Sequence, residues 1–250
     1  MAFMDGAAIV YCGAPPAPDA WGWAFNTAWP VWLAMAAWAG ATWAWAPRGR
    51  AAGAAWGGWG IGALLYLSPL CALSAAFFSV RVLHHLLLVG AVAPLLAWAG
   101  LQRQEPGRRP RVGIGAPMLA LALVLWAWHA PAAYAWGLTT VAGYWLMQGT
   151  LLGAAWWFWR EALRPDRPWT GAVAMLFASV AHMGLLGALI VFAGQLLYPV
   201  HAPGALLWGV APLADQQLGG LLMWVPAIVP FMAAGLWRLA RELRAAGVPA

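Results

Sequence analysis

Residues 169–197 spell WTGAVAMLFASVAHMGLLGALIVFAGQLL, a stretch that contains no Asp, Glu, Lys or Arg. About 20 apolar residues in a helix are enough to cross the hydrocarbon core of a bilayer. The segment before it, RPDRP at 164–168, is a charged turn with two prolines, which ends the preceding apolar stretch. Residues 169–197 are therefore predicted to form a transmembrane helix, and the remaining sequence has the same character.

The composition of the whole chain agrees with a membrane protein. Of the 250 residues, 64% are hydrophobic and only 8% are charged, whereas soluble domains carry about 25% charged residues. The net charge of +6 comes from arginines in short loops, which indicates membrane topology rather than nucleic-acid binding. Residues 1–20 contain no Arg or Lys, so no cleavable signal peptide is expected.

Seven apolar stretches are long enough to span a bilayer. The predicted fold is therefore all-α, a polytopic bundle of seven transmembrane helices that forms one domain at 27–240, between tails at 1–26 and 241–250. The predicted helices lie at 27–46, 56–76, 80–101, 114–136, 140–163, 169–197 and 216–240, with ends uncertain by about 2–4 residues.

All 13 basic residues are arginines. Without a lysine, the chain cannot form the Schiff base that seven-helix retinal proteins use. If the seven helices alternate in direction, twelve arginines fall on one side, which the positive-inside rule assigns to the cytoplasm. The N-terminal tail is then periplasmic and the C-terminal tail cytoplasmic, in a multi-pass protein of the bacterial plasma (inner) membrane. These arginines are Arg48, Arg50, Arg103, Arg108, Arg109, Arg111, Arg160, Arg164, Arg167, Arg238, Arg241 and Arg244.

The thirteenth arginine, Arg81, falls at the outer start of the third helix, where a charge must pair, snorkel or bind something. Asp215 is the outer acid closest to a helix, so an Arg81–Asp215 ion pair is predicted. The two cysteines give no sign of a disulfide framework, because Cys12 lies in the polar tail and Cys71 in an apolar helix.

All five histidines are predicted to lie in the outer half of the bundle: His84, His85, His129, His182 and His201. Imidazole and thioether groups together suit copper, especially Cu(I), whereas the few carboxylates argue against a hard-cation site. Any one of these histidines could instead form an interhelical hydrogen bond. Met183 and Met223 are expected to be packing residues rather than ligands. Pro131, two residues after His129, predicts a kink.

The block DQQLGGLLMW, 215–224, carries the most specific local pattern. Asp215 is expected to cap the seventh helix, with Gln216 and Gln217 at the outer interface. Gly219 and Gly220 allow a close approach to another helix, and Met223 lies one turn below Gly219.

This block resembles the signature of the CtaG family, the membrane assembly factors of caa(3)-type cytochrome c oxidase. HHLLLVGAVAPLLAWAG (84–100), WAWHAPAAY (126–134) and HMGLLGALIVFAGQLLYP (182–199) are also similar to family blocks, and the resemblance covers roughly 77–240. It implies a role in maturing the copper centre of the oxidase's haem–copper subunit. His85, His129 and Asp215 match family motif positions. The chain departs from the pattern at Arg81, where the family has His, and in AGYWLMQG (142–149), which lacks a family His.

Three functions follow as expectations. The first is a copper-binding assembly factor, not an enzyme, which takes Cu(I) from a periplasmic donor and passes it to the oxidase subunit. Since imidazole binds a metal only in its neutral form, the affinity of the protein for Cu(I) should weaken as the pH falls through about 6–7. The second is a metal-free scaffold or accessory subunit of the oxidase. The third, least favoured, is a haem-binding redox protein with two axial histidines.

Overall fold

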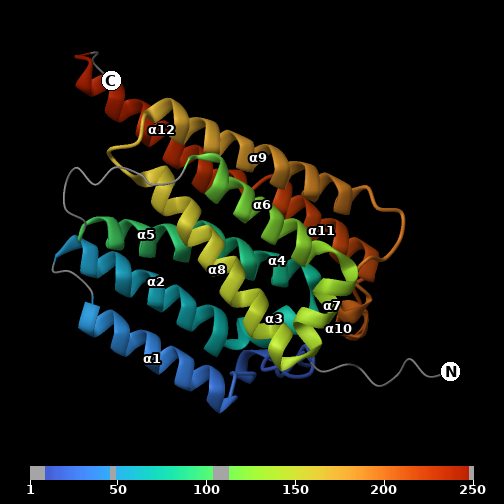
Figure 1. Ribbon diagram of the computed structural model, residues 1–250. Coiled ribbons are helices and arrows are strands. Elements are labelled where there is room, and N and C mark those ends of the chain that lie inside the picture. The colour runs from blue at the N-terminus through green and yellow to red at the C-terminus, as the bar shows by residue number, and fades with distance from the viewer. Residues whose placement is uncertain (1–8, 46–48, 104–112, 248–250) are drawn as a thin grey trace.

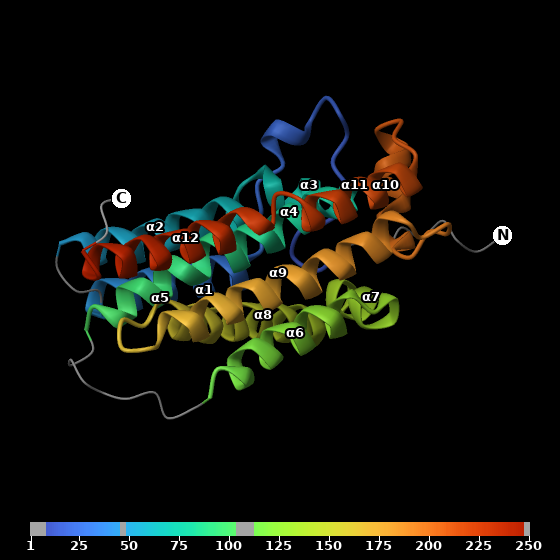
Figure 2. The same ribbon diagram turned by 90° about the horizontal axis from the view of Figure 1, so that it is seen from above.

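The computed structural model describes residues 9–45, 49–103 and 113–247. Within these ranges every regular element is helical, apart from an isolated β-bridge between Ile9 and Gly13. The long helices run roughly parallel and pack as one bundle (Figures 1 and 2). The α-helices are α1 (Trp29–Trp45), α2 (Arg50–Leu67), α3 (Pro69–Ala76), α4 (Phe78–Leu87), α5 (Ala93–Leu101), α6 (Gly115–His129), α7 (Pro131–Thr139), α8 (Val141–Leu163), α9 (Trp169–Val191), α10 (Ala202–Leu207), α11 (Pro212–Trp224) and α12 (Ile228–Ala245).

The all-helical prediction is confirmed for the described residues, and two sharp breaks between helices fall at prolines. Helices α2 and α3 meet at Pro69 with a bend of 54°, and α6 and α7 meet at Pro131 with a bend of 81°. Proline removes a backbone donor and its ring clashes with the preceding turn, so a helix usually ends or bends there. The kink predicted at Pro131 is thus present, and it is sharp enough to end one helix and begin another.

Among the described residues, three helical segments are long and apolar enough to cross a membrane: Phe78–Leu101, Trp169–Val191 and Pro212–Ala245. The number rises to five if each of the two bent pairs counts as one span. The segment Phe78–Leu101 joins α4 to α5 through a π-helical turn at Leu88–Val92. Pro94 follows this turn and has no N–H to donate to it. Because this donor is missing, the α-helical hydrogen-bond pattern is readily interrupted there.

Three of the predicted helix ends are wrong by more than the stated margin of about 2–4 residues. The second predicted helix begins at Arg50 rather than 56, the sixth ends at Val191 rather than 197, and the seventh ends at Ala245 rather than 240. A tertiary contact explains the end at Val191. The Gln216 side chain accepts a hydrogen bond from the Leu197 N–H (2.6 Å) and donates one to the Gln195 carbonyl (3.1 Å). These bonds satisfy backbone groups after Val191, so the chain turns there although its composition remains apolar.

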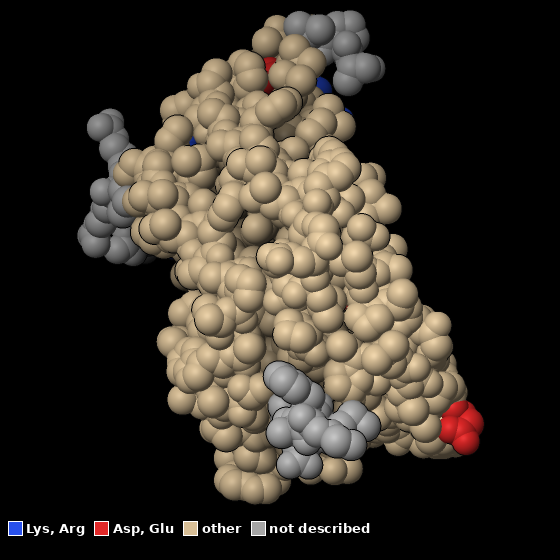
Figure 3. All heavy atoms as spheres, turned by 90° about the vertical axis from the view of Figure 1, so that its right-hand side faces the viewer, with Lys and Arg blue, Asp and Glu red and all other residues tan. Residues whose placement is uncertain are grey.

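The arginine-rich connections lie at one end of the bundle. The opposite end, which we call the histidine-bearing end, carries His129 at the end of α6 and His201 next to α10. The α8–α9 connection, the end of α5, the start of α2 and the C-terminus share one end, whereas α3, α7 and α10 share the other (Figures 1 and 2). The second end faces the viewer in Figure 3 and is nearly free of charged atoms. Arg48, Arg108, Arg109 and Arg111 lie outside the described residues.

Arg238, one of the arginines assigned to the cytoplasmic side, is buried and only 2% exposed. Its guanidinium donates to the carbonyls of Arg164 (2.7 Å) and Arg167 (2.6 Å). It therefore ties α12 to the turn between α8 and α9, where Glu161 also forms an ion pair with Arg167.

The expectation that the two cysteines form no disulfide framework is wrong. Cys12 and Cys71 form a disulfide that links the N-terminal segment to α3. Sequence distance concealed the pairing, because the two positions are 59 apart in the chain. The side-chain amide of Asn26 reinforces the contact by donating to the Tyr66 carbonyl (2.9 Å), beside Cys71.

Candidate functional site

Asp215 caps a helix, but not the one to which it belongs. Helix α11 begins after Ala211 without a side-chain cap. Asp215 instead accepts hydrogen bonds from the N–H of Phe78 (2.6 Å), the N–H of Ser79 (3.2 Å) and the Ser79 hydroxyl (2.5 Å). A carboxylate at this position satisfies free donors in the first turn of α4 and lies at the positive end of the helix dipole.

The predicted Arg81–Asp215 ion pair is absent among the described residues. Arg81 is fully buried, and one guanidinium nitrogen lies 3.6 Å from the Cys12 sulfur. Its Nε and Nη1 atoms have no hydrogen-bond partner among the residues that the structure describes. Asp215 is close by but is occupied by the backbone of α4, so the positive charge of Arg81 lies within the bundle without a carboxylate in contact.

Gly219 and Gly220 lie where α11 packs most closely, as the sequence predicted. A Cβ atom on Gly220 would lie 2.9 Å from the Gly187 carbonyl oxygen of α9. A Cβ atom on Gly219 would overlap the ring of Phe78 in α4. Both glycines are therefore required by close contacts, on opposite sides of α11. Gln217, the remaining polar residue of this block, is exposed.

His201 is buried in a hydrogen-bonded cluster near the histidine-bearing end. Its Nδ1 donates to the Ala75 carbonyl (3.1 Å), so the Nε2 lone pair accepts from the Tyr134 hydroxyl (2.7 Å). Tyr198 stacks on Phe78, with ring centroids 4.2 Å apart, and donates to the His129 carbonyl (2.8 Å). Both ring nitrogens of His201 are engaged, so it has no lone pair to offer a metal in this arrangement.

His84 and His182 do not join the other candidate ligands. His84 packs edge-on against Tyr66, with ring centroids 5.0 Å apart, and neither of its ring nitrogens has a hydrogen-bond partner among the described residues. His182 is half-buried on α9, also with two unpartnered nitrogens. Within the described ranges, no group of three or more His, Cys, Asp or Glu residues is placed to hold a metal ion.

His85 and His129, in contrast, line the same cavity. His85 comes from α4 and His129 from the end of α6, and Met183 of α9 and Met223 of α11 also line the cavity. The other lining residues are Val82, Leu86, Val89, Leu125 and Leu186. The cavity has a volume of about 20 Å³, enough for one water-sized occupant.

The orientation of His129 leaves one nitrogen available. Its Nδ1 lies 2.7 Å from the Leu125 carbonyl, which can only accept, so Nδ1 carries the proton and Nε2 keeps its lone pair. On His85, Nε2 is buried without a hydrogen-bond partner among the described residues. Fixing one nitrogen through a backbone carbonyl is how proteins commonly orient a metal-binding imidazole.

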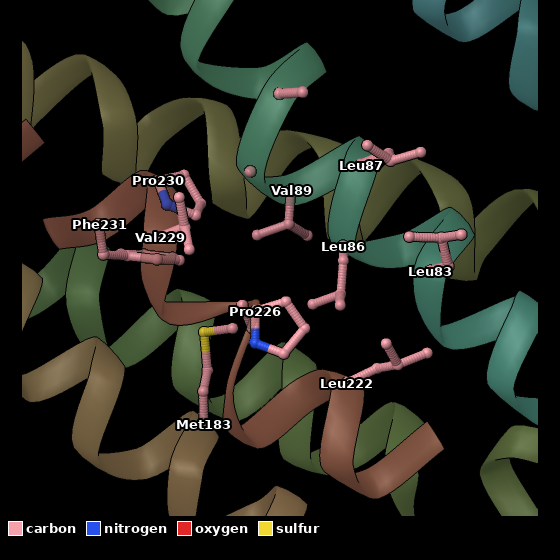
Figure 4. A pocket seen from close by; sticks show the side chains of 13 residues that line it. Leu83, Leu86, Leu87, Val89, Met183, Leu222, Pro226, Val229, Pro230 and Phe231 are labelled. Atoms are coloured by element: carbon pink, nitrogen blue, oxygen red, sulfur yellow. The ribbon is translucent and has the colours of Figure 1, made fainter. Parts of the chain in front are cut away.

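An apolar groove of about 400 Å³ adjoins this cavity. It runs between the α4 to α5 segment and the break between α11 and α12 (Figure 4). Leu86, Val89 and Met183 line both the groove and the cavity. The Met183 side chain rises from α9 toward Pro226 in Figure 4, so a thioether lies at the wall between the two spaces.

Comparison with known proteins identifies the family. The family model described as cytochrome c oxidase caa3 assembly factor matches residues 29–245. The chain belongs to this family. No curated protein and no solved structure matches it. The resemblance inferred from the sequence blocks is thereby confirmed, and the caa3 assembly factor family accounts for most of the chain, including every element that lines the cavity.

Sequence reasoning missed several contacts of this assembly factor. No signal in the sequence indicated that Met183, a predicted packing residue, lines one cavity with His85 and His129. Nothing in the sequence indicated the pairing of Tyr134 in α7 with His201 at the end of the 3-10 helix Pro199–His201. Helix-packing order decides which residues meet, and one sequence does not contain it.

The titration of His201 predicts a pH dependence of stability. Burial, assisted by the charge of Arg81, lowers the pKa of His201 to about 3, from 6.5. The unfolded chain therefore binds a proton that the folded protein does not, so the free energy of unfolding should fall as the pH drops below 6.5. Detergent unfolding of the wild type and His201→Gln, from about pH 7.5 to about pH 4, should give a shallower decline for the variant. If the free energy of unfolding falls equally steeply with pH in both proteins, His201 is not the group responsible.

Proposed function

We propose that this oxidase assembly factor binds Cu(I) through His85 and His129 and hands it to the haem–copper subunit of the oxidase. The observation that carries the proposal is the convergence of these two histidines, from α4 and α6, on one enclosed cavity. Imidazole nitrogen is a good ligand for copper. We do not propose an enzymatic activity, because ion transfer between ligands requires no bond-breaking residues.

The periplasmic side is favoured as the side on which copper enters. The arginine-bearing ends of the helices lie opposite the histidine-bearing end (Figure 1), and arginine-rich loops favour the cytoplasm. The Cys12–Cys71 disulfide joins the N-terminal segment to α3 at the histidine-bearing end, and disulfides persist in oxidising compartments such as the periplasm. Both observations support a plasma-membrane protein that accepts copper from a periplasmic donor.

The groove beside the cavity supports release within the membrane. It is lined by apolar residues and shares Met183 with the cavity, so an ion could pass sideways toward a partner's transmembrane helix without crossing water. The cavity itself argues against haem as the ligand. Its volume of about 20 Å³ is far below the 300–1,000 Å³, roughly, of sites for cofactor-sized molecules.

The direct test is an anaerobic Cu(I) titration of the purified protein against a competing chelator. The wild type should bind one Cu(I), and His85→Ala and His129→Ala should each weaken binding at least about tenfold, as losing a ligand exceeds the effect of outer-shell changes. His182→Ala is the matched control, because His182 lies on α9 but does not line the cavity.

Copper delivery is tested in cells that depend on this protein for oxidase assembly. The His85→Ala/His129→Ala variant should leave the oxidase with its haem but with reduced copper. Full oxidase copper in cells whose variant no longer binds Cu(I) would refute delivery.

A metal-free scaffold is the second candidate function. It is favoured by the absence, within the described ranges, of any group of three or more His, Cys, Asp or Glu side chains suited to a metal. In this case the wild type would not bind Cu(I), and the histidine variants would assemble oxidase with its full copper content.

A further inference from the structure

We infer that Met183 and Met223 complete the copper site, which makes it a two-imidazole, two-thioether site selective for Cu(I). The inference rests on the proposed function and deepens it by assigning the oxidation state of the ion and two further ligands. Four helices contribute one such side chain each to a single cavity: His85 from α4, His129 from α6, Met183 from α9 and Met223 from α11.

The burial of the two methionines fits a ligand role. Met183 and Met223 are each 4% exposed, and the remaining lining of the cavity is aliphatic. Thioether sulfur is a soft, uncharged ligand that prefers Cu(I) to harder divalent ions. A site built from two thioethers and two neutral imidazoles therefore suits Cu(I) better than Cu(II) or Zn(II).

The charge around the cavity points the same way. No Asp or Glu lines it, so a bound ion keeps its full charge. Arg81 lies one helical turn before His85 on α4, fully buried, with no carboxylate in ion-pair contact among the described residues. The cost of burying an ion rises steeply with its charge, and the nearby guanidinium adds repulsion. A monovalent ion is the one that this environment tolerates best.

The test compares four forms of the full-length protein in detergent: the wild type, Met183→Leu/Met223→Leu, the histidine double variant and a control, Met175→Leu. Leucine keeps the volume and apolar character of methionine but lacks the sulfur. Met175 is a suitable control because it is buried on α9, like Met183, yet does not line the cavity. Each form is titrated anaerobically with Cu(I) against a chelator, and separately with Zn(II).

The wild type should bind Cu(I) more tightly than Zn(II). The methionine double variant should lose at least about tenfold in Cu(I) affinity, with little change for Zn(II), whereas Met175→Leu should match the wild type. X-ray absorption at the copper edge of the wild type should reveal sulfur scatterers in addition to nitrogen. This measurement needs no variant, so it holds even if the double variant folds poorly.

The outcomes separate this inference from the proposed function. Histidine-dependent Cu(I) binding without copper–sulfur scattering, or with unchanged affinity in Met183→Leu/Met223→Leu, would overturn the methionine assignment and leave the histidine site standing. Wild-type binding of Zn(II) as tight as that of Cu(I) would overturn the selectivity. A wild type that binds no Cu(I) would overturn both proposals.

Discussion

Replacing Asp215 by alanine is expected to lower the free energy of unfolding by about 2–6 kcal/mol, since two buried backbone donors lose their acceptor at about 1–3 kcal/mol each. The donors are the N–H groups of Phe78 and Ser79, in the first turn of α4. The turn should fray, because no side chain of α4's own N-terminus caps it. SDS-induced unfolding in mixed micelles measures the loss, and hydrogen exchange at Phe78 and Ser79 locates it.

Asp19→Ala provides the control, because Asp19 is an exposed acid, and its removal should change stability by less than about 0.5 kcal/mol. Asp215→Asn should fall between the wild type and Asp215→Ala, since the amide keeps one acceptor but turns its NH₂ toward a donor. Equal stability of Asp215→Ala and wild type would mean that Asp215 does not cap α4.

Gly187→Ala should destabilise the protein by about 1–3 kcal/mol, the usual cost of overpacking. The added Cβ would lie 2.8 Å from the Gly220 carbonyl oxygen and 2.9 Å from the Trp224 nitrogen, and both are backbone atoms that cannot turn aside. Helices α9 and α11 must then separate. Because these helices carry Met183 and Met223, the same substitution should also weaken Cu(I) binding if the methionines are ligands.

Gly184→Ala is the matched control, one turn earlier on α9. Its Cβ would lie 3.5 Å from the nearest atom, a side-chain carbon of Trp224, which is ordinary contact. Alanine favours a helix over glycine by up to about 1 kcal/mol, so this variant should equal or exceed the wild type in stability. A similar loss in both variants would show that the close approach of Gly187 to α11 is not the cause.

Much of the fold was predictable because the bilayer imposes simple rules on sequence. Long uncharged stretches and prolines marked the helices and their breaks, and the break at Pro131 is present. The helix end at Val191 was not predictable, because it depends on the Gln216 side chain reaching the backbone after that residue. The disulfide was also missed, since Cys12 and Cys71 are neighbours only once the N-terminal segment folds back onto α3.

The candidate site was half predictable. His85 and His129 were named from their residue type, their position and their match to family blocks, and they do line one cavity. Met183 lines the same cavity, and its expected role as a packing residue stays a prediction. Asp215 was expected to pair with Arg81 and to cap its own helix, but it caps α4 instead. For Asp215 the sequence predicted that the side chain caps a helix, but it did not predict which helix.

The sequence by itself determined a helical membrane protein, the segregation of arginines from histidines and the family, because hydropathy, charge and local motifs are properties of contiguous residues. Only the tertiary structure decided which histidines share a cavity, which helix Asp215 caps and which cysteines join. Those outcomes depend on the order and rotation of packed helices. Contacts between residues far apart in the chain set that order, such as the approach of Gly187 to Gly220.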